Sequence, residues 1–502
     1  MKKRTAVACI ILALWAIITF AIHRFQHGSL ATGTLGSPSY LLSPASKQDY
    51  DVIVLGSEPE AISAAVAAAE EGASVLLLSQ DARLGGLFVL GQMNSLDLRS
   101  EPQMQKGLFE RWWQEVGRAK AFDIHEAELA FTKLLSEAGV DVRLEVRFSP
   151  VMLQGRLRAI RVDENIPEGP SSYQDYHAKQ FIDGTAEADI AALAGAESSI
   201  GFESMGLKAR MVDTLVFRLE GIDWQKLSQG IKARGKDYAS VDERVAWGHF
   251  SEGGQSLIQR YQAQEEGIRL RGLNLGLQQD GSVLVNALLI HGIEPFAEVS
   301  LKEGRARATR EAQHIVEFLK TQNLPGFESV SYGGVAEKLY IRETRHLKAL
   351  CQLTVDDVLN NVTSLQDVAA GGYPLDVQAL TPHDTGFVYG VPDIYGVKLC
   401  VNIPQNDKLD NLWVIGKAAG YDPLAASSAR VVPFGMALAE AVGIAASMSA
   451  QEGLSPKAFS QSGSHISNLR ARLLARGAYL PEVKDRPLAA PIATLIFRLT
   501  PD

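Results

Sequence analysis

The residues with the clearest chemical meaning form a short turn, Gly56-Ser57-Glu58-Pro59-Glu60-Ala61, between two apolar runs. Residues 51–55 before the turn predict a buried strand, and the Ala-rich residues 62–71 after it predict a helix that Gly72 ends. Unpaired N–H groups and the helix dipole favour negative charge at a helix N-terminus. The turn therefore predicts a site for a nucleotide pyrophosphate.

This turn departs from the usual G-x-G-x-x-G fingerprint of dinucleotide-binding folds. Gly56 fills the first position, whereas Glu58 places a side chain where the backbone should approach phosphate. Ala61, at the third position, still allows the helix to pack closely on the strand. After the second strand, residues 74–78, Ser79 stands where an acid often binds ribose. On this motif alone, a βαβ unit without a ligand is nearly as well supported as a nucleotide site.

A second group of chemically capable residues lies far downstream. Arg342 and Arg345 flank Glu343 on a predicted strand edge. They can bind a substrate carboxylate or sulfate, since arginine holds such groups with two parallel hydrogen bonds, or they can form salt bridges at the strand edge. His383 is a candidate to accept a hydroxyl proton during oxidation, and a solvated loop histidine is the alternative.

Composition excludes several classes of protein. The chain has 502 residues and a net charge of −9, and it has no basic stripe beyond the extreme N-terminus, so nucleic-acid binding is not expected. Its three cysteines form no C-x-x-C, which argues against a redox-active pair, a zinc site or an iron–sulfur site. The apolar surroundings of Cys351 and Cys400 favour two buried free thiols, and one disulfide in an oxidising compartment is the alternative.

The positioning elements alternate between strands and helices at both ends of the folded part, which indicates an α/β fold. Further strands are predicted within 140–146, 158–162, 179–187, 339–346 and 411–417, and helices within 101–139, 190–196, 301–320, 430–448 and 466–480. The expected divisions are a nucleotide-binding domain in two parts, 49–200 and 339–450, an inserted α+β substrate domain, 201–338, and a C-terminal helix and tail, 451–502.

The N-terminus carries a membrane signal. Basic residues 2–4 precede an uncharged apolar run of 17 residues, 6–22. We expect residues 1–24 to form a transmembrane signal anchor, or else a signal peptide cleaved near residues 29–31, and residues 25–48 to form a linker. The basic flank predicts that the main body lies on the non-cytoplasmic side, which is periplasmic, lumenal or extracellular, and that it is secreted if the segment is cleaved.

Five segments, taken in order, carry a family resemblance. They are GSEPEA (56–61), RLGGL (83–87), FIDGTAEADIAALAGA (181–196), YIRETRHL (340–347) and DNLWVIGKAAGYDPLAASSARVVPFGMALAEAVGIAA (410–446). Together they resemble the FAD-dependent oxidoreductases of the glutathione-reductase superfamily, in the subfamily whose first turn reads G-G-x-P-E-G. The resemblance extends from about residue 50 to about residue 480.

The resemblance implies an FAD-binding Rossmann-like domain of glutathione-reductase type and hydride transfer from a small organic substrate to flavin. No second G-x-G-x-x-G occurs in the middle third, so a dedicated NAD(P)H domain is not expected, and the electron acceptor stays open. No metal is implied. The implied catalytic residues are His383, Arg342 and Arg345, and the implied cofactor-binding residues are Gly56, Ser57, Glu58, Pro59, Ala61, Ser79, Gly85, Gly86, Asp183, Gly184, Gly416, Arg430 and Pro433.

Two other functions remain open from the sequence. One is a degenerate member of this family that has lost cofactor affinity and acts as a membrane-tethered binding or scaffold module. Three departures from the family pattern are compatible with it: Glu58, Ser79 and segment 183–186. An NAD-dependent dehydrogenase would rest on the first βαβ unit alone, and it would not explain segment 410–446.

Overall fold

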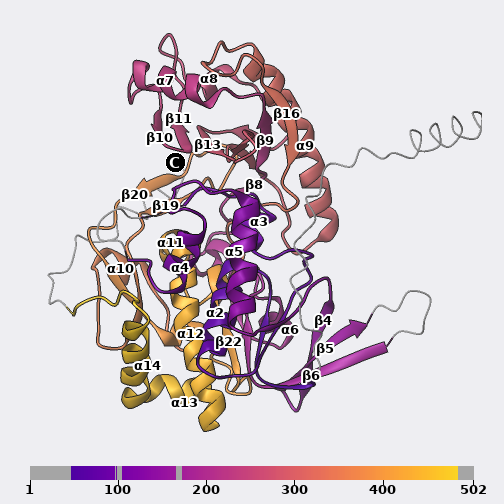
Figure 1. Cartoon of the computed structure of the whole chain (residues 1–502), viewed down its shortest axis with the longest axis vertical. Helices are drawn as coiled ribbons and strands as arrows, with labels where there is room; N and C mark the ends of the chain where they lie inside the picture. The colour runs from indigo at the N-terminus through magenta and orange to yellow at the C-terminus, as the bar shows by residue number, and fades with distance from the viewer. Residues whose placement is uncertain (1–46, 97, 99–103, 165–171, 484–502) are drawn as a thin grey trace, which may run out of the picture. The chain divides into compact units, whose positions relative to one another are not determined.

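A mainly parallel sheet carries the predicted βαβ unit in the computed structural model, which describes residues 47–96, 98, 104–164 and 172–483 (Figure 1). Strand β1 (Asp49–Leu55), helix α2 (Pro59–Glu70) and strand β2 (Val75–Leu78) form the unit. With β3 (Asp141–Arg143), β6 (Ser172–Asp183) and β22 (Leu412–Val414), the parallel strands run in the order β3-β2-β1-β6-β22. Antiparallel β5 (Arg156–Glu164) and β4 (Arg147–Leu153) extend from β6.

The two faces of this sheet pack into separate cores, because side chains alternate along each strand. Val52, Val54 and Leu77 join the larger core with α2 and with α12 (Val432–Glu452). Ile53 and Leu76 join a smaller core on the other face. Helices α2 and α12 lie side by side (Figure 1).

Glycine makes the approach of α2 and α12 possible. A Cβ added at Gly443 would lie 2.3 Å from the carbonyl oxygen of Ala64. The larger core also contains α3 (Gly86–Val89), α4 (Leu108–Glu115) and α5 (Ile124–Glu137), where the Trp112 ring stacks on Phe131 at 5.1 Å and meets Phe122 edge-on. Aromatic residues of α4, α5 and the segment between them therefore form part of this core.

The middle of the chain forms a six-stranded antiparallel sheet with a core of its own. The buried residues of this core lie between Leu215 and Ile341, apart from Ile124. The strand order is β10 (Ser240–Asp242), β11 (Val245–Gly248), β13 (Leu273–Leu277), β14 (Val283–Val285), β9 (Phe217–Glu220) and β16 (Ser331–Val335). Its other elements are α7 (Trp224–Arg234), α8 (Leu257–Arg260), α9 (Glu298–Lys320) and the small sheet β12 (Ile268–Leu270), β15 (Leu288–Ile290), β8 (Asp213–Thr214).

The remaining elements connect these parts. They are α6 (Asp189–Leu193), β7 (Ser198–Ile200), η1 (Gly201–Met205), β17 (Arg345–Leu347), α10 (Val355–Leu359), β18 (Asp367–Gly371), β19 (Leu375–Val377), β20 (Phe387–Tyr389), β21 (Tyr395–Lys398), η2 (Leu399–Asn402), η3 (Gly416–Ala418), α11 (Pro423–Ala429), α13 (Pro456–Gln461) and α14 (Gly463–Ala475). The expected strand at 339–346 forms only as β17, because Tyr340 bridges Thr214 while residues 345–347 pair with β7.

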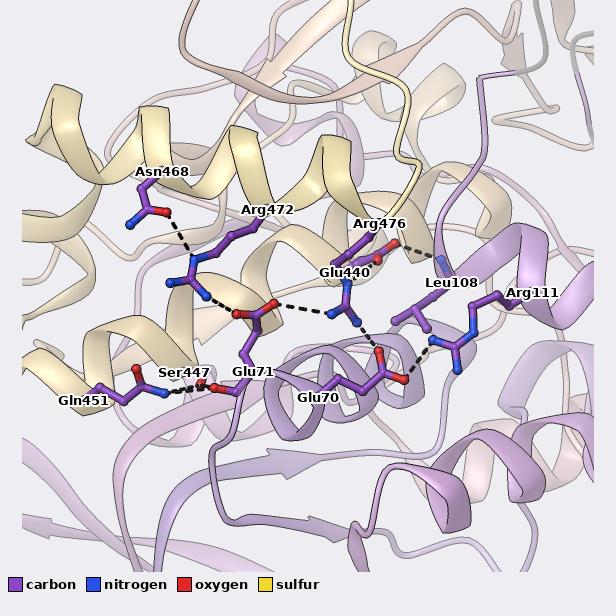
Figure 2. Close-up of polar contacts among 10 residues, drawn as sticks. All are labelled: Glu70, Glu71, Leu108, Arg111, Glu440, Ser447, Gln451, Asn468, Arg472 and Arg476. Atoms are coloured by element: carbon purple, nitrogen blue, oxygen red, sulfur yellow. Dashed lines mark hydrogen bonds and ion pairs between the residues drawn. The ribbon is translucent and has the colours of Figure 1, made fainter.

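Helix α14 is tied to α2 and α12 by ion pairs (Figure 2). Arg476 pairs with Glu70, with Glu71 at 3.3 Å and with Glu440 at 3.1 Å. Glu440 is 1% exposed and also accepts the N–H of Leu108 at 2.9 Å. One guanidinium therefore connects the C-terminal helix to the two helices that pack on each other.

Cys351 and Cys400 form a disulfide, so the favoured prediction of two free thiols is wrong. The two cysteines are 49 residues apart and meet because the loop before α10 and the start of η2 lie together. The loop and η2 are connected by the hydrogen bond from Leu350 N–H to Ile403 O, at 2.9 Å.

Helix α12 is long and apolar enough to cross a membrane, but 94% of its apolar window is buried within the protein. It is a core helix, and no other helix among the described residues meets the same test. The expected N-terminal anchor and linker lie almost entirely outside the described residues.

Candidate functional site

The predicted turn lies where the parallel strands β1, β2, β6 and β22 end at one edge of the sheet. The Gly56 N–H donates to Leu78 O and the Gly184 N–H donates to Leu55 O, each at 2.8 Å. Gly56 has φ of +111°, and a Cβ there would lie 2.3 Å from Gly184 O. Glycine is therefore required at position 56, and ligands of open α/β sheets bind outside this edge.

Helix α2 begins at this edge with Pro59 in its first turn. A Cβ added at Gly184 would lie 2.8 Å from the Cβ of Ala61, so both positions require small residues. The N-cap residue, Glu58, makes no side-chain hydrogen bond to the helix. Helix α12, which has Pro433 in its first turn, also lacks a side-chain cap. Both helices therefore leave their first N–H groups without a side-chain cap, as an anion site requires.

The side chain of Glu58 instead turns toward the Gly85–Gly86 pair. Its Oε2 accepts the N–H of Leu87 at 2.8 Å, and a Cβ added at Gly86 would lie 2.1 Å from the same oxygen. Gly85 N–H donates to Ser57 O at 2.9 Å, which holds the pair against the first turn. Burial raises the pKa of Glu58, and the nearby Lys338 and Lys417 oppose that rise.

The two serines of the predicted site both contact Asp81. The Ser57 hydroxyl donates to Asp81 Oδ2 at 2.6 Å, and Ser79 Oγ accepts the Asp81 N–H at 3.0 Å. Lys338 forms an ion pair with the same carboxylate. Asp81 therefore places a carboxylate beside the end of β2, close to position 79, where the usual ribose-binding acid is replaced by serine.

Glu60 is a buried carboxyl that the sequence did not single out. A Cβ added at Gly435, in the first turn of α12, would lie 2.5 Å from Glu60 Oε1. Burial raises the pKa of Glu60 to about 8, and the charge of Glu58 adds to the rise. No local pattern predicts this contact, because it joins the starts of two helices that begin at Pro59 and Val432, far apart in sequence.

Gly416 and Lys417 follow strand β22. Gly416 has φ of +78°, and the Lys417 Nζ donates to Glu187 Oε1 at 2.8 Å and to Ile341 O at 2.7 Å. Burial lowers the pKa of Lys417, but Glu187, Glu58 and Tyr340 act in the other direction and leave the pKa raised. A half-buried ion pair therefore lies beside the Gly416 turn.

Asp183, at the end of β6, is fully buried and caps its own turn. It accepts the N–H and hydroxyl of Thr185 and, at 2.7 Å, the N–H of Ala191 in α6. Burial raises the pKa of Asp183 to about 6, although these hydrogen bonds oppose the rise. The carboxyl group fixes the backbone that carries Gly184 and uses its hydrogen bonds within the protein.

Arg342 lies in an arginine network, defined here as Arg342, Arg430 and Arg271 with Tyr340, Asp376 and Gln378. Arg342 is 2% exposed, donates to Val212 O at 2.8 Å and Thr214 Oγ1 at 2.6 Å, and lies 4.6 Å from the Tyr340 ring. Tyr340 Oη accepts from Arg430, which also pairs with Asp376 at 3.1 Å. Gln378 donates to Asp376 at 2.6 Å and accepts from Arg271 at 2.8 Å.

The other two predicted catalytic residues lie elsewhere. Arg345 pairs with Asp189 at 2.9 Å and lies 4.1 Å from the Phe296 ring, so it does not act together with Arg342. His383 is exposed on a turn whose Asp384 carboxylate accepts several backbone N–H groups.

His346 is buried and bonded to Glu343 at 2.9 Å, and Glu343 accepts the Met211 N–H.

The strand order, the glycine turn and the two uncapped helix N-termini define a dinucleotide-binding fold. A family model described as FAD dependent oxidoreductase matches residues 51–473, and the chain belongs to this family. FAD is the cofactor of the family. No curated protein matches the chain.

Solved structures with similar folds include flavin enzymes and a reductase-like protein. A geranylgeranyl bacteriochlorophyll reductase-like protein from Thermoplasma acidophilum is 14% identical, with TM-score 0.36 over 86% of this chain and 84% of that one. A myxobacterial chondrochloren halogenase is 11% identical, with TM-score 0.40 over 87% and 84%. The p-nitrophenol 4-monooxygenase of Pseudomonas putida is 10% identical, with TM-score 0.41 over 87% and 91%.

The backbone at this edge of the sheet fits FAD. Five features would hold the cofactor, because each allows close approach of the backbone or offers uncapped N–H groups. They are Gly56, the first turn of α2, the Gly85–Gly86 pair, the Gly416 turn and the first turn of α12. The side chain of Glu58 is the exception, because it fills the space next to Gly86 with a carboxylate.

Proposed function

We propose that the protein is an FAD-dependent oxidoreductase that transfers hydride from a small organic substrate to flavin. The observation that carries the proposal is the pair of uncapped helix N-termini, of α2 and α12, beside the glycine turns at one edge of the sheet. Bound FAD supplies the redox chemistry, and the protein supplies orientation and electrostatics. We further propose that the chain falls in the glutathione-reductase superfamily, in the subfamily with a G-G-x-P-E-G first turn.

Cofactor binding tests this proposal directly. We expect the purified full-length protein to contain FAD or, after removal of bound flavin, to take up FAD with quenching of flavin fluorescence. Because a ligand that binds only the native state raises the unfolding midpoint, FAD should also raise Tm. A colourless protein whose Tm does not respond to FAD would contradict the proposal.

A second candidate function is a membrane-tethered binding or scaffold module without cofactor. One observation favours it, the Glu58 carboxylate bonded to Leu87 N–H beside Gly86. This function predicts that FAD raises Tm of neither the wild type nor a Glu58 variant. An FAD-dependent oxidoreductase requires that FAD raises Tm of at least the wild type.

We propose that the substrate carries a carboxylate, which the arginine network binds. Arg342 is buried and donates hydrogen bonds to neutral oxygens, the Val212 carbonyl and the Thr214 hydroxyl. Burial lowers the pKa of Arg342 to about 10, and the Arg430 and Arg271 charges act in the same direction. A substrate anion would stabilise these guanidinium groups, since arginine forms strong paired hydrogen bonds with carboxylates.

Succinate binding, measured by calorimetry, tests the substrate class, with succinamide as the uncharged control ligand. We expect succinate to bind and succinamide not to bind, and Arg342→Met to weaken succinate binding by at least about tenfold, the loss of a charge-assisted hydrogen bond. Arg345→Met is the matched control and should leave binding unchanged, because Arg345 is held by Asp189. Arg271→Gln, at the half-buried end of the network, should weaken binding even if Arg342→Met fails to fold. Equal binding of both ligands would contradict the proposal.

We propose that the folded body acts on the non-cytoplasmic side of a membrane, anchored by the N-terminal segment or secreted after its cleavage. The Cys351–Cys400 disulfide supports this location, because disulfides persist in oxidising compartments. The electron acceptor lies outside this proposal, as does any nucleic-acid partner, which the net charge of −9 disfavours.

A further inference from the structure

We propose that Glu58 is an internal competitor of the cofactor pyrophosphate: its carboxylate occupies the anion position between the first turn of α2 and the Gly85–Gly86 pair, and FAD binds only when this carboxylate leaves. The proposal concerns the pyrophosphate part of the cofactor. It rests on the proposed function only for the identity of the full ligand.

The contacts of Glu58 are those of a bound anion. One carboxylate oxygen accepts the Leu87 N–H at 2.8 Å, and all three atoms of the carboxylate lie within 2.4 Å of where a Gly86 Cβ would be. Gly86 therefore leaves the space that this carboxylate fills. As the N-cap residue of α2, Glu58 starts the helix without capping it by a side-chain bond.

The lysine charges near Glu58 favour an anion in this place. Lys338 and Lys417 both act in this direction, although each also pairs with another carboxylate, Asp81 or Glu187, and Asp81 acts against it. A pyrophosphate placed at the same N–H groups would bring like charges together, which is unfavourable at a half-buried site. Glu58 and the pyrophosphate therefore exclude each other.

A purely structural role for Glu58 makes a different prediction. If the carboxylate only fastens residues 85–87 to the first turn, then its removal loosens the loop, lowers Tm and weakens any ligand. If it competes with phosphate, then its removal strengthens phosphate ligands even though one hydrogen bond is lost.

The experiment measures Kd for FAD, ADP and adenosine with full-length wild type, Glu58→Gly, Glu58→Gln and Glu60→Gln. ADP carries the pyrophosphate without flavin, and adenosine carries no phosphate. For Glu58→Gly we expect Kd for both ADP and FAD to fall by at least about tenfold, which is about 1.4 kcal/mol, with no change for adenosine. Glu58→Gln keeps the size of the side chain and an acceptor for Leu87 N–H, so it should give a smaller gain.

Glu60→Gln is the control for loss of a neighbouring carboxyl, because Glu60 contacts Gly435 and not Gly86. For Glu60→Gln, the fall in log Kd for ADP and FAD should be less than half of the fall that Glu58→Gln gives. Circular dichroism and Tm without ligand check that each variant folds, and Glu58→Gln carries the test if Glu58→Gly does not fold.

The outcomes separate this inference from the proposed function. Tighter ADP binding by Glu58→Gly without any FAD binding supports the inference and contradicts an FAD enzyme. Equal FAD and ADP affinities in wild type and both Glu58 variants overturn the inference and leave the oxidoreductase standing. Weaker binding by both variants, or no ADP binding by any protein, also overturns it.

Discussion

Single carboxyl groups set the properties of the candidate site. Glu58, Glu60 and Asp183 lie at the ends of neighbouring strands or the start of α2, and burial raises the pKa of each. An acid whose pKa is raised by folding holds its proton more tightly in the folded state than in the unfolded state. Such groups stabilise the fold at low pH and lose that contribution as pH rises through the folded pKa.

Glu60 gives the largest such effect that can be tested by one substitution. Its pKa is about 8 in the folded protein against 4.5 for the free side chain. We expect the wild type to lose stability between pH 5 and pH 8, with Glu60→Gln losing less over the same range, by at most about 4 kcal/mol. Urea unfolding at both pH values measures the difference. An identical pH dependence in wild type and Glu60→Gln would show that Glu60 keeps an ordinary pKa.

Sequence reasoning reached part of this residue-level picture. Gly56, Ala61 and Gly184 are recognisable because a close backbone approach requires small side chains, and the structure gives each such a contact. Glu60 and Arg271 were not recognisable, because their partners lie on elements far away in sequence. Binding of one anion by both Arg342 and Arg345 was one of two alternatives that the sequence left open. The structure separates the two side chains, because the chain pairs with Thr214 at Tyr340 and with β7 from Arg345 onward.

At the level of elements, ion pairs of Arg476, at the end of α14, connect α2 to α12. Arg476 reaches Glu440, Glu70 and Glu71 (Figure 2). Glu440 is buried. Removal of one partner of a buried ion pair leaves an uncompensated charge, which is far more costly than loss of an exposed pair.

We expect Arg476→Ala to lower the free energy of unfolding by roughly 3–5 kcal/mol. Lys457→Ala, which removes the exposed pair with Asp407, is the control and should cost less than about 1 kcal/mol. Denaturant unfolding of both variants provides the comparison. The double variant Arg476→Ala/Glu440→Gln should recover part of the loss, since the buried charge is then absent. Equal, small losses in both single variants would mean that α14 contributes little to this packing.

The elements themselves were largely predictable, because strand and helix periodicities are local. The first βαβ unit appears at Asp49–Leu55, Pro59–Glu70 and Val75–Leu78, within a few residues of the expected bounds. Pro59 was expected in the turn before the helix, and it proves to be the first residue of the helix. The expected helical region 101–139 contains two helices, α4 and α5, because residues 117–123 include a glycine turn and the N-cap Asp123.

At the scale of the whole molecule, one covalent bond joins distant segments. The Cys351–Cys400 disulfide closes a loop of 49 residues, and such a constraint on the unfolded chain stabilises a protein by about 4 kcal/mol in the chain-entropy model. Sequence could not decide its formation, because the pairing depends on how η2 and the loop before α10 come together.

We therefore expect dithiothreitol to lower the unfolding midpoint of the wild type. The double variant Cys351→Ala/Cys400→Ala should already have the lower midpoint, and dithiothreitol should not change it further. Thermal melts with and without the reductant test this. Two free thiols, titrated in the unreduced and unfolded protein beyond any contributed by Cys9, would contradict the bond.

Glu440 also bears on how the chain is made. Helix α12 resembles a transmembrane segment in length and hydropathy, and Glu440 stands near its middle. In a chain exported through a protein-conducting channel, as proposed here, such a helix risks partition into the lipid before the body has folded. A charge at the helix centre opposes that partition by about 2.5–3.5 kcal/mol. The carboxylate that later binds Arg476 would thus first help the nascent chain pass through the membrane.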